Sequence, residues 1–268
     1  MKNPVHKQKL YVIKIGGHVI DHSENLHQFL KAFVGLEGLK IIVHGGGKIA
    51  TQIAHKLGIE TNLIQGRRVT DLESLRVVTM VYAGLINKNI VAQLQAIGCN
   101  AIGLSGADSN SIQAIKRPIQ EFDYGFVGDL TRQSVHLEPI DQLLKVGLVP
   151  VFSAITHDGQ GQLLNTNADT IASALAVALS DHYETALIYC FDKKGVLRDI
   201  DSEKSLIPEI DAAQFKSLKA QGLIADGMIP KLQNAFEAIF NGVKVVYIGL
   251  ATELDQVGHT SFGTKLIK

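Results

Sequence analysis

Short apolar runs alternate with longer segments of helical periodicity along the chain, and this alternation limits the possible folds more than any other feature. The strand-like runs lie at 10–15, 39–44, 100–106, 147–153, 184–190 and 243–249. Such alternation is typical of α/β proteins, in which crossover helices join parallel strands and cover both faces of the sheet. We therefore predict an α/β fold with a mainly parallel central sheet. A change in pattern near residue 180 predicts two lobes that share this sheet.

Local signals predict several further elements. Apolar residues on one helix face follow Gly47, and Gly58 ends the pattern. Thr70 and Glu73 have the spacing of a capping box, which predicts the start of a long helix. Antiparallel β structure is predicted at 111–136, with a turn at 124–125 and a hairpin at 157–162.

The composition argues against several classes of protein. Of the 268 residues, 46% are hydrophobic and 19% charged, which is ordinary for a globular protein. Lys and Arg total 26, as do Asp and Glu, so no global field favours nucleic acid or an anionic membrane. The apolar helical stretch 171–179 is too short to span a bilayer, and the first residues lack a signal-peptide core. We expect a cytoplasmic protein that binds neither nucleic acid nor membrane.

The cysteine and histidine patterns do not predict a metal site. Cys99 and Cys190 lie in apolar surroundings without metal-ligand spacing, which is typical of buried thiols. The ten histidines include no H-x-x-x-H pair beside a suitable carboxylate. We therefore expect no dedicated protein cage for a metal ion.

Two of the predicted strands end in glycine-rich loops, KIGG at 14–17 and HGGG at 44–47. In open parallel sheets, ligands lie beyond the carboxyl ends of the strands, where glycine N–H groups can approach an anion. The second loop fails the Walker pattern, because Ile42 stands where its first glycine should and Ile49 follows Lys48. Gly45, Gly47 and Ala50 do fit the dinucleotide pattern. A dehydrogenase, another type of kinase and simple tight turns all stay open at this point.

The dehydrogenase requires an acidic residue that closes the next strand about 20 positions on. Asp71 lies near that distance, but it stands where the long helix is predicted to begin. The dinucleotide interpretation also assigns no role to several polar residues further along the chain. It is therefore the weaker alternative.

Lysines and an arginine supply candidate anion-binding groups. Lys14 interrupts the first strand two residues before Gly16, so it can neutralise a phosphate there or lie on the surface. Lys231 follows a proline at a plausible first helical turn, and local physics alone makes it a helix-surface lysine. Arg67 and Arg68 lie just before the long helix, and one of them can hold a carboxylate through two hydrogen bonds.

The segment NTNAD at 165–169 places two amides and a carboxylate at a helix start. Asn167 can cap this helix, and Asp169 in its first turn is favoured by the helix dipole. Capping does not require Asn165. The segment can therefore also bind a small polar substrate, with Asp169 holding lysines in position.

Together these stretches resemble the motifs of the amino acid kinase family, and within it those of the kinases that act on N-acetyl-L-glutamate. The five motifs are Lys14 to Gly17, His44 to Gly47, Gly66-x-Arg68-Val69-Thr70, Asn165 to Asp169, and Asp226 to Lys231. They occur in the family's order and cover almost the whole chain. Each motif alone is a weak signal, whereas the ordered set is specific.

The resemblance implies a three-layer αβα sandwich. Its N-terminal lobe, 1–180, would bind the acylated amino acid and form the dimer, and its C-terminal lobe, 181–268, would bind ATP. The implied reaction passes the γ-phosphoryl group of ATP to the side-chain carboxylate of N-acetyl-L-glutamate. Its products are N-acetyl-L-glutamyl 5-phosphate and ADP, in the second step of arginine biosynthesis.

The resemblance also assigns roles to residues. Lys14 and Lys231 would stabilise the transferring phosphoryl group, and Asp169 would orient both lysines. The implied substrate-binding residues are Gly46, Gly47, Arg68, Asn165 and Asn167, and the phosphate loops add Gly16, Gly17 and Gly45. The implied ATP-binding residues are Asp192, Lys193, Lys194, Gly195, Val196, Leu197, Leu223, Ile224 and Ala225. Mg²⁺ is expected on the nucleotide phosphates and water rather than on protein ligands.

Several points stay open at the level of sequence. The segment 191–197 departs from the family's usual Thr/Ser-Asp-Val-x-Gly pattern at its hydroxyl and apolar positions. N-succinyl-L-glutamate is an alternative substrate, and Arg67 or Lys88 could bind its extra carboxylate. A non-catalytic ligand sensor on the same fold is an alternative of another class. Nine residues precede the first predicted strand, too few for the additional N-terminal helix of arginine-inhibited hexamers, so we expect a homodimer without arginine feedback.

Overall fold

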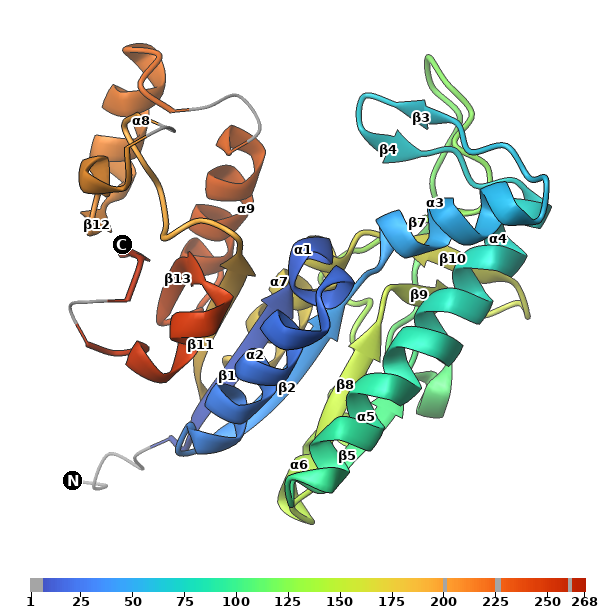
Figure 1. Cartoon of the computed structure of the whole chain (residues 1–268), viewed down its shortest axis with the longest axis horizontal. Helices are drawn as coiled ribbons and strands as arrows, with labels where there is room; N and C mark the ends of the chain where they lie inside the picture. Colours follow the sequence, from blue (N-terminus) through green and yellow to red (C-terminus); the bar gives the residue numbers. More distant parts are fainter. Residues whose placement is uncertain (1–6, 200–201, 225–227, 260–261) are drawn as a thin grey trace.

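The computed structural model describes residues 7–199, 202–224, 228–259 and 262–268. Its centre is an eight-stranded sheet in the order β12-β14-β13-β11-β1-β2-β8-β5 (Figure 1). The strands are β1 (Lys9–Ile15), β2 (Leu39–His44), β5 (Ala101–Leu104), β8 (Val149–Ser153), β11 (Glu184–Phe191), β12 (Glu209–Ile210), β13 (Val245–Leu250) and β14 (Thr264–Leu266). All neighbours pair in parallel except β13 and β14. The prediction of a mainly parallel central sheet is confirmed.

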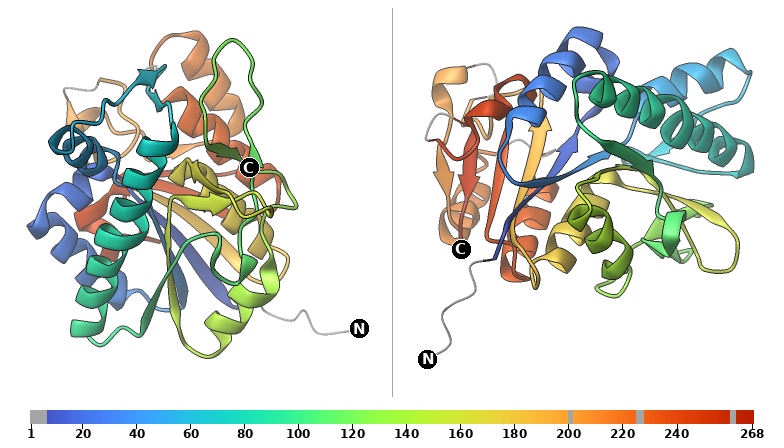
Figure 2. Two further views of the ribbon diagram at one scale, coloured as in Figure 1. Left: turned by 90° about the vertical axis from the view of Figure 1, so that its right-hand side faces the viewer. Right: turned by 90° about the horizontal axis from the view of Figure 1, so that it is seen from below.

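Helices cover both faces of this sheet, which gives the expected three layers (Figure 2). One face carries α1 (Gly17–Asp21), α2 (Ser23–Gly35), α5 (Asn87–Ala96) and the short 3₁₀ segment η4 (Ala251–Gln256). The other face carries α6 (Leu137–Lys145), α7 (Ala168–Leu179) and α9 (Ile229–Phe240), and α8 (Ala212–Ala220) packs against α9. Two single-turn 3₁₀ segments, η2 (Asp108–Asn110) and η3 (Glu203–Ser205), lie in connections.

The core lies on both sides of the central strands. Leu10, Val12 and Ile13 on β1 are fully buried, as are Ile41 and Ile42 on β2. A parallel strand between two helical layers buries both of its faces, which explains the nearly continuous apolar sequences. Lys14 interrupts this pattern and is only partly buried. Its position predicts an opening at the carboxyl end of the sheet.

A smaller four-stranded sheet lies beside the large one, in the order β6-β7-β10-β9. Its strands are β6 (Ile115–Lys116), β7 (Val127–Asp129), β9 (Ile155–His157) and β10 (Leu163–Thr166). The predicted hairpin at 157–162 is confirmed as the β9–β10 connection, and β6 pairs with β7 antiparallel as predicted for 111–136. Gly125, in the predicted turn, has a φ of 72°, which glycine adopts without strain. A separate two-stranded hairpin joins β3 (Leu63–Ile64) to β4 (Arg67–Arg68).

The long helical segment 72–96 begins differently from the prediction. It consists of α4 (Leu72–Val78), the π-helical segment η1 (Thr79–Ile86) and α5, and α3 (Gly47–Lys56) packs against its first part. The predicted Thr70–Glu73 capping box is wrong. Asp71 is the N-cap, and its carboxylate accepts a hydrogen bond from the Ser74 N–H at 2.7 Å. The Thr70 hydroxyl is unavailable for capping, because it bonds elsewhere.

The same segment, Leu72–Ala96, is long and apolar enough to pass a test for a membrane span by length and composition. It lies beside the large sheet, where α5 packs against β5 and β8. Asn87, at the start of α5, is buried among polar partners rather than facing an apolar surface. These contacts are those of a helix in the core layer of a globular protein.

The two halves of the large sheet come from different parts of the chain. Strands β11 to β14 all begin after residue 180, and β1, β2, β5 and β8 all precede it. β1 and β11 pair along seven residues where the halves meet. A boundary between lobes near residue 180 stays a prediction.

Candidate active site

Lys14 and Asp169 form an ion pair at the carboxyl end of β1. Lys14 Nζ lies 2.8 Å from Asp169 Oδ1, and the two side chains are only 12% and 16% exposed. Asp169 is in the first turn of α7, which Asn167 caps by accepting hydrogen bonds from the N–H groups of residues 169 and 170. The Asn167 Oδ1 atom is thus committed to the cap, and Asp169 is fixed at the helix start.

Lys231, on α9, approaches the same place from the other half of the sheet. Its Nζ lies 3.8 Å from the ring centroid of Phe191, and Lys14 Nζ lies 5.4 Å from that centroid. Burial lowers the pKa of Lys231, Asp169 opposes this shift, and the positive charge of Lys14 adds to it. The structure therefore brings together the three residues predicted to be catalytic, although they are far apart in the sequence. The ring of Phe191, which sequence reasoning did not single out as their partner, lies near the ammonium groups of both lysines.

In the second glycine loop, the position of Gly46 leaves no room for a side chain. Gly46 has a φ of 145°, and a Cβ at this position would collide with Ile86 Cδ1. Gly46 is also the N-cap of α3, which begins at Gly47. The N–H groups of a helix's first turn lack intrahelical partners and carry the positive end of its dipole, so they can bind an anion. Gly45 lies against Ala168, which places this loop beside the start of α7.

The first glycine loop faces the same region. α1 begins at Gly17, and the Gly16 N–H donates to the Cys190 carbonyl at 3.2 Å. This bond ties the end of β1 to the end of β11, next to Phe191. Burial raises the pKa of the Cys190 thiol to about 12, so the thiol stays neutral and structural.

A buried pair of polar side chains, His44 and Asn87, holds the second loop. His44 is fully buried, and its Nδ1 lies 2.9 Å from the Gly45 carbonyl oxygen while its Nε2 lies 3.0 Å from Asn87 Nδ2. A carbonyl only accepts and an amide NH₂ only donates, so the ring carries its proton on Nδ1. Asn87 Nδ2 also donates to the Val151 carbonyl. Burial lowers the pKa of His44 to about 4, which keeps the ring neutral.

Arg68 and Asn165, both predicted to bind the substrate, are each held by hydrogen bonds to other parts of the chain. Arg68 donates to the Gly47 carbonyl at 2.9 Å and to the Thr51 hydroxyl at 2.6 Å, so it reaches from the β3–β4 hairpin to the second glycine loop. Asn165, on β10, donates from Nδ2 to the Thr70 hydroxyl at 3.0 Å. Sequence reasoning missed this role of Thr70, because its spacing to Glu73 suggested a helix cap.

The two cations considered for a succinyl carboxylate differ in availability. Lys88 donates to the Gly103 carbonyl at 3.1 Å and to the Asn87 side chain, so it is bound to the start of α5 and to β5. Arg67 is exposed on the β3–β4 hairpin.

Lys48 lies on α3, and its Nζ is 3.7 Å from Asp21 Oδ2. The side chain of Lys48 is 64% exposed.

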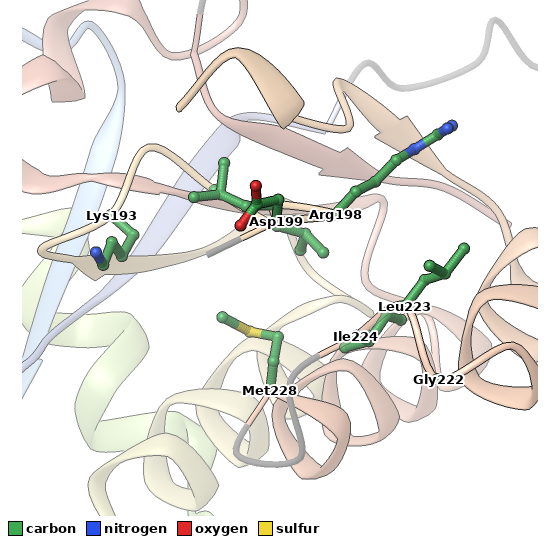
Figure 3. Close-up of a pocket in the computed structure, with 10 residues that line it drawn as sticks. Lys193, Arg198, Asp199, Gly222, Leu223, Ile224 and Met228 are labelled. Carbon is green, nitrogen blue, oxygen red and sulfur yellow. The ribbon is translucent and has the colours of Figure 1, made fainter. Parts of the chain in front are cut away.

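A cavity of about 490 Å³ lies beside the C-terminal half of the sheet (Figure 3). Its lining includes six of the nine residues predicted to bind ATP, namely Lys193, Gly195, Val196, Leu197, Leu223 and Ile224. Sequence reasoning missed the lining residues Arg198, Asp199, Gly222 and Met228. Met228 extends into the space opposite Asp199 in Figure 3.

Of the other three predicted ATP contacts, two lie outside this lining and one is not among the described residues. Lys194 forms an ion pair with Glu203 at 3.1 Å, and neither it nor Asp192 is part of the cavity lining. Ala225 lies outside the described residues. Gly195 has a φ of 156° and meets Thr264 where its side chain would be, so the loop after β11 packs closely on β14. Within the described ranges, no group of three or more His, Cys, Asp and Glu side chains could hold a metal ion.

Glycine loops and converging lysines at the carboxyl edge of a parallel sheet are features of enzymes that transfer phosphoryl groups. The chain belongs to the amino acid kinase family, whose family profile matches residues 9–249. It is 53% identical to an acetylglutamate kinase of Bacteroides fragilis over 262 residues, which cover 98% of both chains. An acetylglutamate kinase of Cytophaga hutchinsonii is 53% identical over 263 residues, covering 97% of this chain and 99% of the relative.

Solved structures agree with this fold. A crystal structure of a Streptococcus mutans protein superimposes with a TM-score of 0.76 at 27% identity, covering 97% of this chain and 98% of the other. The predicted three-layer αβα sandwich of the amino acid kinase family is confirmed.

Proposed function

We propose that the protein phosphorylates the side-chain carboxylate of N-acetyl-L-glutamate with ATP, which yields N-acetyl-L-glutamyl 5-phosphate and ADP in the second step of arginine biosynthesis. The observation that carries this proposal is the meeting of Lys14, Asp169 and Lys231 between two glycine loops. The acetylglutamate kinases that match nearly the whole chain at 53% identity support the choice of substrate.

The chemistry requires alignment and charge neutralisation more than proton transfer. A glutamate side chain in water has a pKa of about 4.3, so the attacking carboxylate is already ionised near neutral pH and needs no general base. Lys14, at the end of β1, and Lys231, at the start of α9, lie on opposite sides of the reacting phosphoryl group. Both ammonium groups stabilise the charge on its oxygens and on the leaving ADP.

Asp169 acts as a positioning residue in this mechanism. Its ion pair with Lys14 at 2.8 Å fixes the direction of that ammonium group, and its negative charge raises the pKa of Lys231 against the effect of burial. The backbone N–H groups of Gly17, Gly46 and Gly47 complete the cradle for phosphoryl and carboxylate oxygens.

The substrates occupy opposite halves of the sheet in this proposal. Arg68 and Asn165 hold the α-carboxylate and the amide of the acylated amino acid in the N-terminal lobe, 1–180. The cavity beside β11, lined by Leu197, Leu223 and Ile224, receives the adenosine part of ATP in the C-terminal lobe. Mg²⁺ binds to the ATP phosphates and to water, which suits an ion that readily keeps water ligands.

The decisive test is hydroxylamine trapping of the acyl phosphate, with ATP and either N-acetyl- or N-succinyl-L-glutamate. We expect a hydroxamate with N-acetyl-L-glutamate that requires ATP, Mg²⁺ and Lys14. The Lys48→Ala variant is the matched control, because Lys48 is exposed on α3 near the same loop. No hydroxamate from either substrate would refute the proposed reaction, and product from the succinyl compound alone would change the substrate.

We also propose a cytoplasmic homodimer. Met80 and Leu85 are 57% and 48% exposed on the helical segment 72–96, beside β5 at the edge of the large sheet. A second copy placed against this helix would cover both side chains. Light scattering should give the mass of a dimer, and a Met80→Asp and Leu85→Asp variant should give that of a monomer. If the doubly substituted protein still has the mass of a dimer, the dimer interface lies on another surface.

A further inference from the structure

The hydroxyl group of Thr70 contacts both residues proposed to hold the amino-acid substrate. Thr70 is completely buried, and its Oγ1 lies 3.0 Å from Asn165 Nδ2 and 3.3 Å from the Arg68 carbonyl oxygen. Asn165 is 95 positions away in the sequence, on β10 of the small sheet. The proposed reaction assigns no role to this hydroxyl, and Asp71 rather than Thr70 caps the following helix.

The chemistry of the two partners fixes the direction of both hydrogen bonds. The Arg68 carbonyl can only accept, so the Thr70 hydroxyl proton is directed to it. The hydroxyl oxygen then accepts a hydrogen bond from Asn165 Nδ2, because the NH₂ group of an amide is a donor. This arrangement determines which end of the Asn165 amide faces Thr70. The remaining atom, Asn165 Oδ1, accepts no hydrogen bond within the described part of the chain, and the side chain is only partly buried.

The backbone around Thr70 makes this arrangement rigid. The Thr70 N–H donates to the Tyr124 carbonyl at 2.9 Å, and the Phe126 N–H donates to the Thr70 carbonyl at 2.7 Å. The Asn165 N–H in turn donates to the Phe126 carbonyl at 2.9 Å. Thr70 and Asn165 are thus both bonded to the same short segment, so the side-chain hydrogen bond between them forms at little further cost in conformational freedom.

We propose that Thr70 is a positioning residue that sets substrate specificity, by turning Asn165 so that its Oδ1 accepts the N–H of the substrate's acylamino group. This inference rests on the proposed reaction and identifies what the amide subsite recognises. The site requires a hydrogen-bond donor on the atom that links the acyl group to the α-carbon. An ester oxygen at this position presents a lone pair to Asn165 Oδ1 and leaves it unpaired, which costs binding.

The first measurement uses the wild-type enzyme with two acceptors, N-acetyl-L-glutamate and its ester analogue 2-acetoxyglutarate. We expect the KM of the ester to be higher by about tenfold or more, as for a site that loses one hydrogen bond and keeps an unpaired acceptor. Equal KM values for the amide and the ester would overturn the inference. No turnover of the amide at all would instead refute the proposed reaction, so the two failures are distinct.

The second measurement uses Thr70→Val and Thr70→Ser. Valine has the shape of threonine without its hydroxyl, so Asn165 can rotate and present its NH₂ to the substrate. We expect the KM of N-acetyl-L-glutamate to rise about tenfold with kcat changed less than about threefold, and the preference for amide over ester to shrink. Serine keeps the hydroxyl and should restore the wild-type preference. A valine variant with the wild-type preference would overturn the inference.

Thr156→Val is the matched control for loss of a buried hydroxyl. Thr156, on β9, is completely buried and shares a 2.7 Å hydrogen bond with Thr166, in the same small sheet as Asn165. Removal of the Thr156 hydroxyl should lower the thermal stability of the protein without changing the ratio of the KM for the amide to the KM for the ester. If Thr156→Val changes this ratio as much as Thr70→Val, the effect reflects general loosening of the sheet, and the inference fails.

Discussion

Buried His44 makes the stability of the protein depend on pH in a way that the structure allows us to calculate. The neutral ring donates from Nδ1 to the Gly45 carbonyl and accepts at Nε2 from Asn87. A proton on Nε2 would face the Asn87 NH₂ group, and the fully buried ring is shielded from the solvent that would stabilise the charge. The pKa of His44 is accordingly lowered from 6.5 to about 4 in the folded protein.

The sign follows from proton binding in the two states. Between pH 6.5 and 4 the unfolded chain binds a proton at His44 and the folded protein does not, so acid favours unfolding. The contribution of His44 is complete above pH 6.5 and is lost as the pH falls towards 4. The difference of 2.5 pKa units corresponds to about 3 kcal/mol in all, of which about 2 kcal/mol is already lost at pH 5.

Urea unfolding at pH 7 and pH 5 measures this loss when the wild type is compared with His44→Gln. Glutamine places a neutral acceptor near Asn87 and does not titrate, so the decrease between the two pH values should be about 2 kcal/mol smaller in the variant. All other titrating groups are common to both proteins, and His55→Gln, which removes an exposed histidine from α3, serves as the comparison. Equal decreases in wild type and His44→Gln would refute the assignment of a buried neutral ring.

Three further predictions concern the site itself. Lys14→Ala should lower kcat by roughly 10²–10³-fold in an ADP-release assay, while Lys48→Ala stays near wild type; near-normal turnover of Lys14→Ala would contradict the mechanism. Because burial lowers the pKa of Lys231, kcat/KM for ATP should fall at a lower alkaline pH than for an ordinary lysine, and Lys231→Arg should move that fall upward. If Lys231→Arg leaves the pH profile unchanged, the fall of kcat/KM at alkaline pH belongs to the titration of another group. Gly46→Ala should cost about 1–3 kcal/mol of unfolding free energy, and adding Ile86→Ala should not restore it fully, because the φ of 145° remains.

The fold was predictable because its strongest signals are local. A strand such as β2, Leu39–His44, is a continuous apolar run, and its boundaries coincide with the predicted 39–44. The sequence patterns did not predict β12 and β14, which have two and three residues and lie toward one edge of the sheet. A strand this short has too few side chains for a periodic pattern, and its pairing partners decide its conformation.

Residues of the candidate site that belong to a sequence motif could be predicted one by one. Residues whose place in the site depends on contacts with distant parts of the chain could be predicted only in part. The ion pair of Lys14 and Asp169 follows from two motifs, but the bonds from Asn87 to His44 and from Asn165 to Thr70 join residues 43 and 95 positions apart. No local spacing predicts such contacts. The same limitation explains the mistaken cap at Thr70, since the local pattern fitted while a distant amide used the hydroxyl.

The position of Phe191 suggests how the site tolerates two lysines before any phosphate arrives. Burial lowers the pKa of Lys231 and the nearby ammonium group of Lys14 adds to this shift, whereas Asp169 and Asp192 oppose it. The face of an aromatic ring attracts cations without adding a charge of its own, and both ammonium groups lie near the ring of Phe191. An aromatic ring holds the ammonium groups together while their positive charge stays available to the phosphoryl group in transfer.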